Sequence, residues 1–200
     1  MQGSFGVSVL ELIAYLVPGG IALNAILWRF PKTIPFRSQN LPEQLLLLAT
    51  AYVLGHIIAA GSEPLVRLRQ LLQRLIRRPR RAGCYAFYDE LRQLLSARFA
   101  FPLRRSAEFG LCLRILEQNA QSSIAAVERL RALTLFARNM CVCLIGVAVG
   151  AAISHYILAS WVCLFGSFAL FVRYLRFEEA MSTLVFESAY VALSPSKTTA

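Results

Sequence analysis

Four runs of apolar residues dominate the hydrophobic pattern of the chain. They cover residues 5–28, 41–60, 136–154 and 156–172. A helix needs roughly 20 apolar residues to cross a hydrocarbon core about 30 Å thick, so each run qualifies or nearly so. Only His155 separates the last two runs, which indicates a tight helical hairpin of antiparallel neighbours. The pattern predicts an all-α, polytopic membrane protein with four transmembrane helices in two hairpins and a cytoplasmic helical insertion.

Pro18 lies in the middle of the first run and is followed by Gly19 and Gly20. Proline cannot donate a backbone hydrogen bond to the carbonyl of residue 14, and its ring crowds that carbonyl. We therefore expect a kink or a break in the first helix at this point. The stretch 29–40 contains two prolines and three basic residues, which predicts a short irregular connection.

Between the second and third runs the pattern becomes amphipathic. Leucines recur at spacings of three and four residues from Leu65 to Leu75, with arginines on the other faces, which predicts a surface helix. A second helix is expected from about residue 85 to 99. A third apolar stripe, from Phe109 to Val127, continues into the third run without a helix-breaking residue. We expect it to form one continuous helix that projects from the bilayer.

The chain accordingly divides into four predicted parts. They are a first transmembrane hairpin (5–61), an arginine-rich helical segment (62–135), a second transmembrane hairpin (136–173) and a helical tail (174–200). The second part holds 14 arginines and 6 acidic residues, hence a net charge of +8. Because loops rich in Lys and Arg stay in the cytoplasm, this segment and both termini are expected on the cytoplasmic side of an inner membrane. The basic residues of the first hairpin loop, Arg29, Lys32 and Arg37, favour the opposite orientation but are fewer.

The charge excess points to an acidic partner. The whole chain carries a net charge of +10, although only 16% of its residues are charged and 57% are hydrophobic. Anionic lipid attracts such segments by about 1 kcal/mol per basic residue near the surface. Nucleic acid is the alternative, because clustered arginines neutralise phosphates and Tyr85, Phe87 and Tyr88 are available for base stacking. The candidate lipid or partner contacts are Arg67, Arg74, Arg77, Arg78, Arg80, Arg81, Arg173 and Arg176.

Nothing in the sequence predicts an enzyme. The chain contains no phosphate-binding loop, no H-E-x-x-H zinc motif, no G-x-S-x-G nucleophile motif and no dinucleotide-binding glycine pattern. Cys141 and Cys143 have neither the spacing nor the companion ligands of a zinc site. The five cysteines are interpreted as small buried hydrophobes. We expect no cofactor and no metal.

Six polar residues inside or beside the apolar runs are candidates for a site within the membrane. Such groups are costly in lipid and usually face other protein or water. One interpretation lines a polar path with some of them. The other assigns them to interhelical hydrogen bonds worth roughly 1 kcal/mol, or to contacts with the membrane interface. The six are Glu11, Tyr15, Asn24, His56, Arg138 and Asn139.

Small residues at four-residue spacing indicate close helix packing. Gly146 and Gly150 form a G-x-x-x-G motif in the third run, and Gly55 lies between Ala51 and Ala59 in the second. The motif serves contacts within one chain and contacts between chains equally well. Because four helices enclose little space, any pore would need an oligomer. Self-association through these helices is our leading hypothesis.

Four short segments together resemble a known group of proteins. The segments are residues 15–19 (YLVPG), 52–56 (YVLGH), 136–139 (FARN) and 173–178 (RYLRFE). They are similar to segments of small multi-pass bacterial proteins found beside anti-phage and CRISPR defence genes, a group that includes the four-helix membrane subunit of the Kiwa system. The resemblance implies a homo-oligomeric membrane component that senses infection or perturbs the membrane together with a cytoplasmic partner. The alternative is an ion channel or small-solute transporter with a path lined by Glu11, Asn24 and His56.

Overall fold

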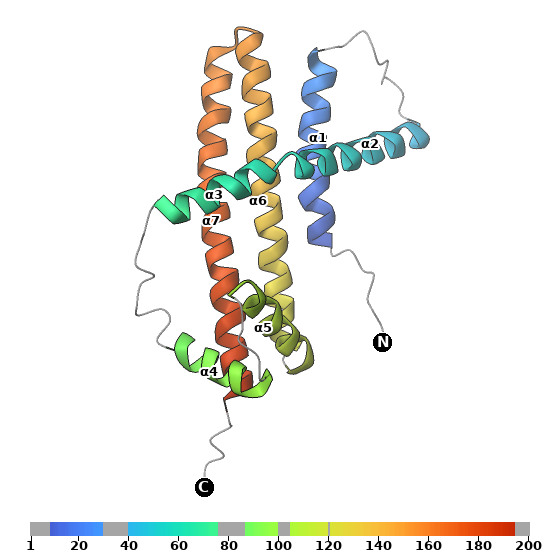
Figure 1. The fold of residues 1–200 in the computed structure, drawn as a ribbon. Coiled ribbons are helices and arrows are strands. Elements are labelled where there is room, and N and C mark those ends of the chain that lie inside the picture. The colour runs from blue at the N-terminus through green and yellow to red at the C-terminus, as the bar shows by residue number, and fades with distance from the viewer. Residues whose placement is uncertain (1–8, 30–39, 76–86, 100–104, 120, 195–200) are drawn as a thin grey trace. The chain divides into compact units, whose positions relative to one another are not determined.

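The computed structural model describes residues 9–29, 40–75, 87–99, 105–119 and 121–194, and these residues form helices without any strand. Figure 1 labels the seven helices of these residues. They are α1 (Val9–Arg29), α2 (Leu41–Ala60), α3 (Glu63–Leu75), α4 (Tyr88–Phe99), α5 (Arg105–Asn119), α6 (Gln121–Ile153) and α7 (Ile157–Leu193).

Four helical stretches are long and apolar enough to cross a membrane. They are Val9–Arg29, Leu41–Leu71, Ser123–Ile153 and Ile157–Leu193. In their most apolar windows only 11 to 39% of the residues are buried within the protein, so most of their apolar side chains need a lipid environment. For the described residues, the predictions of an all-α fold and of four such helices are therefore confirmed. The chain has the helices of a multi-pass membrane protein.

The chain divides into two compact units. Unit 1 contains residues 1–70 and 132–176, and unit 2 contains residues 71–131 and 177–200. The long helices α6 and α7 contribute residues to both units. Each unit is therefore formed by two separate segments of the chain.

In unit 1, a short turn around His155 joins α6 to α7. The backbone N–H of His155 donates to Ala152 at 3.0 Å, and that of Tyr156 donates to Ala151 at 2.9 Å, which closes the end of α6. Further along, the Ser160 hydroxyl donates to the carbonyl oxygen of Ala148 at 2.9 Å. The two helices thus run back along each other from this turn.

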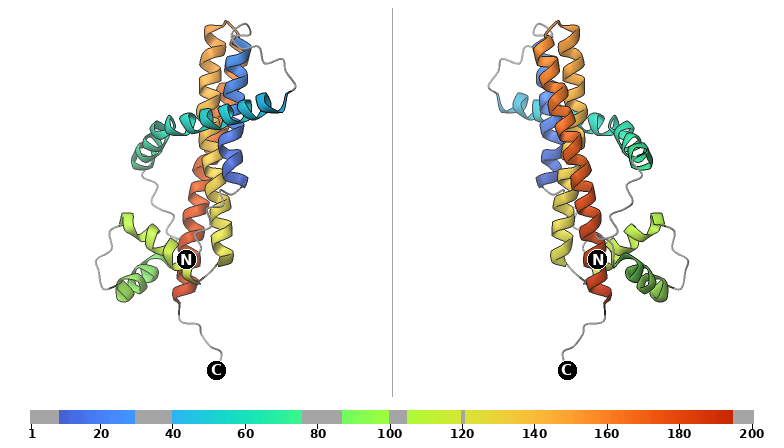
Figure 2. Two further views of the ribbon diagram at one scale, coloured as in Figure 1. Left: turned by 90° about the vertical axis from the view of Figure 1, so that its right-hand side faces the viewer. Right: turned by 90° about the vertical axis from the view of Figure 1, so that its left-hand side faces the viewer.

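The relation between α1 and α2 is different. Both views in Figure 2 show α2 crossing α1 steeply, whereas α1, α6 and α7 lie side by side. The steep crossing does not have the form of an antiparallel pair. The arrangement in two hairpins therefore stays a prediction.

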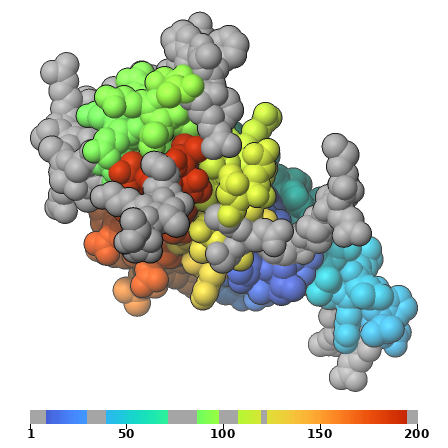
Figure 3. Space-filling view, turned by 90° about the horizontal axis from the view of Figure 1, so that it is seen from below, coloured from blue at the N-terminus to red at the C-terminus, as the bar shows by residue number. Residues whose placement is uncertain are grey.

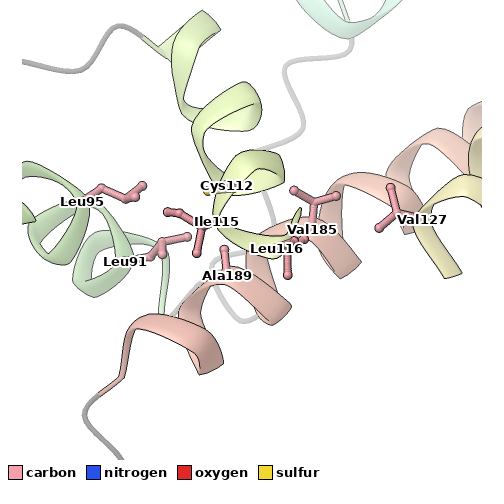
Figure 4. Close-up of a cluster of buried hydrophobic side chains, with 8 residues drawn as sticks. All are labelled: Leu91, Leu95, Cys112, Ile115, Leu116, Val127, Val185 and Ala189. Carbon is pink, nitrogen blue, oxygen red and sulfur yellow. The ribbon is translucent and has the colours of Figure 1, made fainter. Parts of the chain in front are cut away.

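Unit 2 has an apolar core of its own (Figure 4). It combines side chains from α4, α5, the start of α6 and the end of α7. Figure 3 shows the last turns of α7 beside α4. The buried members are Leu91, Leu95, Cys112, Ile115, Leu116, Val127, Val185 and Ala189. Amphipathic helices that are too short to be stable alone become stable by burying their apolar faces together.

Two details of the sequence prediction are wrong. The apolar stripe that ends at Val127 does not lie on one helix, because α5 ends at Asn119 and α6 begins at Gln121, with different directions in Figure 1. The two helices instead place Leu116 and Val127 in the same cluster. The first membrane helix is also not broken, since α1 continues through Pro18, and the alternative of a kink there stays a prediction.

Candidate functional site in the membrane helices

Asn139 on α6 supplies the hydrogen bond that Pro18 removes from α1. A proline at position 18 leaves the carbonyl oxygen of Ala14 without its usual helical donor. The side-chain Nδ2 of Asn139 donates to that oxygen at 3.2 Å. A neighbouring helix that pairs a freed backbone group makes proline acceptable in a membrane helix. Asn139 is completely buried, so its amide is part of this helix contact.

A second contact repeats the first one helical turn later. The thiol of Cys143 donates to the carbonyl oxygen of Pro18, with Sγ 3.3 Å from the oxygen. This pair and the Asn139–Ala14 pair are both separated by 125 residues in the chain. A constant separation means that α1 and α6 run parallel, so that their C-terminal ends lie at the same end of unit 1.

The contact between α6 and α7 is also polar. The hydroxyl of Ser167 donates to the carbonyl oxygen of Cys141 at 3.1 Å and lies 3.1 Å from the Cys141 sulfur. Both side chains are buried. The cysteines of the described residues are free thiols. Cys112, Cys141 and Cys143 are buried, as the sequence interpretation expected, whereas Cys163 is only half-buried and Cys84 lies outside the described residues.

Glycines allow α1 and α2 to touch backbone to backbone where they cross. A Cβ added to Gly19 would overlap the carbonyl oxygen of Ala51, and one added to Gly55 would overlap the carbonyl oxygen of Tyr15. Ala51 and Gly55 are the buried residues of α2. The small residues noted in the second apolar run therefore serve a contact within the chain.

Three aromatic rings lie beside this crossing. The rings of Tyr15 and His56 are stacked, with centroids 4.1 Å apart. Tyr52 meets His56 edge-on at 4.6 Å and Tyr15 at 6.2 Å. Tyr15 and His56, both predicted as polar candidates, are thus brought together by the close approach of α1 and α2, with Tyr52 added.

The other candidates lie elsewhere. Glu11 is half-buried and Asn24 is exposed on α1, while Asn139 lies between α1 and α6. Arg138 is half-buried, and its Nε has no hydrogen-bond partner in the described part of the chain. Positions 146 and 150 on α6 are exposed, and a Cβ added to either glycine would meet open space.

The structure places few of the arginines that were expected to contact lipid or a partner. Arg67, Arg173 and Arg176 are exposed. Arg74 belongs to α3, but its side chain is outside the described residues, as are Arg77, Arg78, Arg80 and Arg81 entirely. Predicted contacts of these last five side chains therefore stay predictions.

A hollow of about 560 Å³ opens where α1 ends beside the α6–α7 turn. The rings of Trp28 and Tyr156 lie on it with centroids 5.4 Å apart. Its lining residues are Trp28, Arg29, Ile153, Ser154, His155 and Tyr156. The sequence alone does not predict this site, because its residues come from two parts of the chain that lie about 125 positions apart. Their only sequence signal is an aromatic and a basic residue at the end of an apolar run.

Unit 2 holds a separate polar cluster around Glu108. This carboxylate is only 2% exposed, accepts a hydrogen bond from the Tyr88 hydroxyl and forms an ion pair with Arg92 at 3.2 Å. Burial, and then the charge of Glu108, raise the pKa of the Cys112 thiol to about 11. Nearby in the unit, the Tyr190 hydroxyl donates to Glu90 at 2.6 Å, which raises the pKa of that hydroxyl. These contacts fasten α4 to α5 and to α7.

Within the described ranges no group of three or more His, Cys, Asp or Glu side chains is close enough to bind one ion. Comparisons of the chain with protein-family models, with curated proteins and with solved structures found no match. The class of multi-pass membrane protein therefore rests on the helices themselves.

Proposed function

We propose that the chain is a non-enzymatic component of a bacterial inner membrane, which self-associates in the bilayer and presents unit 2 to a cytoplasmic partner. The observation that carries the proposal is the separate apolar core of unit 2, which includes parts of the same α6 and α7 that contribute to unit 1. At 33 and 37 residues these helices exceed the roughly 20 residues that a bilayer requires. A folded unit held on such helices suits a binding role.

The proposed topology has two membrane hairpins, with both termini and the arginine-rich segment in the cytoplasm. The net charge of +8 in residues 62–135 supports this orientation. The parallel direction of α1 and α6 also supports it, because both outer connections then lie on one side of the membrane. A role in anti-phage defence, as a sensor or membrane-perturbing subunit, follows from the resemblance described above and belongs to the same proposal.

Self-association is supported by two glycines of α6, Gly146 and Gly150, at which an added Cβ would contact none of the described residues. Gly19 and Gly55 pack at the α1–α2 crossing, whereas Gly146 and Gly150 form an exposed strip on α6 that carries no side chains. Such a strip allows a second helix to approach closely in lipid. The channel alternative gains less support, because the Tyr15 ring covers one face of His56 and Asn24 lies on an exposed part of α1.

The oligomeric state tests the first part of the proposal. The mass of the full chain in nanodiscs or mild detergent should exceed that of one copy, and Gly146→Leu with Gly150→Leu should reduce it. Gly20→Leu is the matched control, because Gly20 on α1 also has open space around it. A strictly monomeric full chain would contradict self-association.

Crosslinking in living cells tests the partner. A photoreactive amino acid at the exposed Arg114 or Glu117 of α5 should form adducts with one soluble protein. The control position is Trp161, an exposed apolar residue of α7 that should crosslink to lipid or to another copy.

An enzyme fusion tests the topology. Alkaline phosphatase fused at Ser38 should be active, because the proposed topology places Ser38 outside the cytoplasm. A cytoplasmic Ser38, or equal adducts from all three positions, would contradict the proposed topology or the partner role.

A further inference from the structure

The hollow between the end of α1 and the α6–α7 turn has the chemistry of an anion site. Arg29 provides a permanent positive charge, and no carboxylate is among the lining residues. Ser154 and His155 add a hydroxyl and an imidazole, both able to donate hydrogen bonds. Arginine recognises phosphate with two parallel hydrogen bonds more readily than any other side chain. The lining therefore favours a phosphate group over a cation.

The backbone of His155 adopts a strained conformation that brings its imidazole to the hollow. His155 has a φ of 63°, in the left-handed region, and is the only described non-glycine residue with a positive φ. Glycine would adopt this conformation with less strain. A histidine at the tip of the turn instead puts a second nitrogen-bearing side chain at the hollow, beside Arg29.

The location of the hollow points to a lipid as the source of the phosphate. It lies where three helices that are long enough to span the bilayer begin or end: α1, α6 and α7. Trp28 is 67% exposed and Tyr156 is 52% exposed, so both rings are available to surrounding molecules. Exposed Trp and Tyr side chains collect at the depth of the lipid headgroups. A ligand in the hollow would thus meet both aromatic rings and Arg29.

We infer that this hollow binds the phosphate of an anionic phospholipid, of the phosphatidylglycerol type, at the membrane surface. Arg29 pairs with the phosphate, and Ser154 and His155 donate hydrogen bonds to its oxygens or to the glycerol hydroxyls. The rings of Trp28 and Tyr156 contact the glycerol backbone and the first carbons of the chains. Zwitterionic lipids are disfavoured, because the lining residues contain no carboxylate to pair with an ammonium group.

Tryptophan fluorescence gives a direct test on the full chain. The sequence has two tryptophans, so Trp161→Phe leaves Trp28 as the only one. In neutral detergent, short-chain phosphatidylglycerol should change its fluorescence saturably, and native mass spectrometry should detect one retained lipid per copy. Short-chain phosphatidylcholine should bind at least about tenfold more weakly. Equal binding of the two lipids would overturn the inference.

Three variants and one soluble anion separate the possible outcomes. Arg29→Gln should weaken phosphatidylglycerol binding about tenfold, which is the loss of one charge-assisted hydrogen bond. His155→Asn, which tolerates the left-handed turn, should weaken it by a smaller factor. Arg129→Gln, at an exposed arginine near the start of α6, is the control and should leave binding unchanged. If inorganic phosphate alone saturates the signal as tightly as the lipid, the site binds free anions and the lipid inference is wrong.

Discussion

Gly55 and Tyr15 meet backbone to backbone at the crossing of α1 and α2, so closely that a Cβ on Gly55 would overlap the carbonyl oxygen of Tyr15. If the two helices moved apart to make room, the rings of Tyr15 and His56 would no longer stack. The crossing therefore depends on the absence of a side chain at position 55. It is also the contact that a single methyl group should damage most.

We expect Gly55→Ala to destabilise the protein by about 1–3 kcal/mol, the usual cost of forcing extra volume into a packed contact. Unfolding in mixed micelles, followed by circular dichroism, measures this change. Gly20→Ala is the matched control, because its Cβ would meet open space among the described residues. Its effect should stay within about 0.5 kcal/mol. Equal losses for the two variants would mean that the crossing is not close.

The bond between Asn139 and Ala14 predicts a coupling with Pro18. Asn139→Leu should cost about 1–2 kcal/mol, because the carbonyl oxygen of Ala14 loses its donor. In a Pro18→Ala background the backbone N–H of residue 18 can donate to Ala14, so the same substitution should cost much less. A double-mutant cycle of unfolding free energies measures the difference. Additive costs would show that Asn139 does not replace the missing helical bond.

The ion pair in unit 2 predicts a rescue. Arg92→Met leaves the buried carboxylate of Glu108 without its cation and should reduce protection of the α4 amides in hydrogen exchange. We expect a loss of about 1–2 kcal/mol, because Arg92 is 48% exposed and solvent weakens the pair. Adding Glu108→Gln should restore most of it. Glu117→Gln, at an exposed acid of the same helix, is the control and should restore nothing.

Cys112 predicts a loss of stability in alkaline solution. Its thiol has a pKa of about 11 in the folded protein against an ordinary 9.0, so the folded state binds the proton more tightly. The resulting stabilisation is fully present below pH 9 and is lost as the pH rises towards 11. Thermal unfolding midpoints should therefore fall more steeply over this range in the native protein than in Cys112→Val. Parallel curves would contradict the prediction.

The membrane helices were accessible from the sequence because bilayer thickness fixes their length. Runs such as residues 41–60 have no other stable environment, and the structure contains a helix over that range. The break between α5 and α6 cannot be predicted from the sequence in this way. The apolar stripe from Phe109 to Val127 fits one straight helix as well as two helices folded together. Only packing against α4 and α7 selects the second form.

The polar contacts between helices are even harder to predict from the sequence. Proline at position 18 predicts that the carbonyl oxygen of Ala14 lacks its helical hydrogen bond, but the sequence does not indicate which helix supplies another donor. Asn139 was one of several polar residues able to do so. The lipid site is harder still, since Arg29 and His155 each have ordinary roles at a membrane boundary. Their proximity depends on the parallel register of α1 and α6.

The Asn139–Ala14 bond also sets an order of events during synthesis. The donor lies 125 residues after the acceptor. At 5–20 residues per second a ribosome needs about 6–25 s to cover that distance. For this time the first helix carries an unpaired carbonyl and cannot complete its final contacts in lipid. Packing of the first helix is thus complete only when the second half of the chain has been made, so the speed of translation sets the earliest time at which this contact can form.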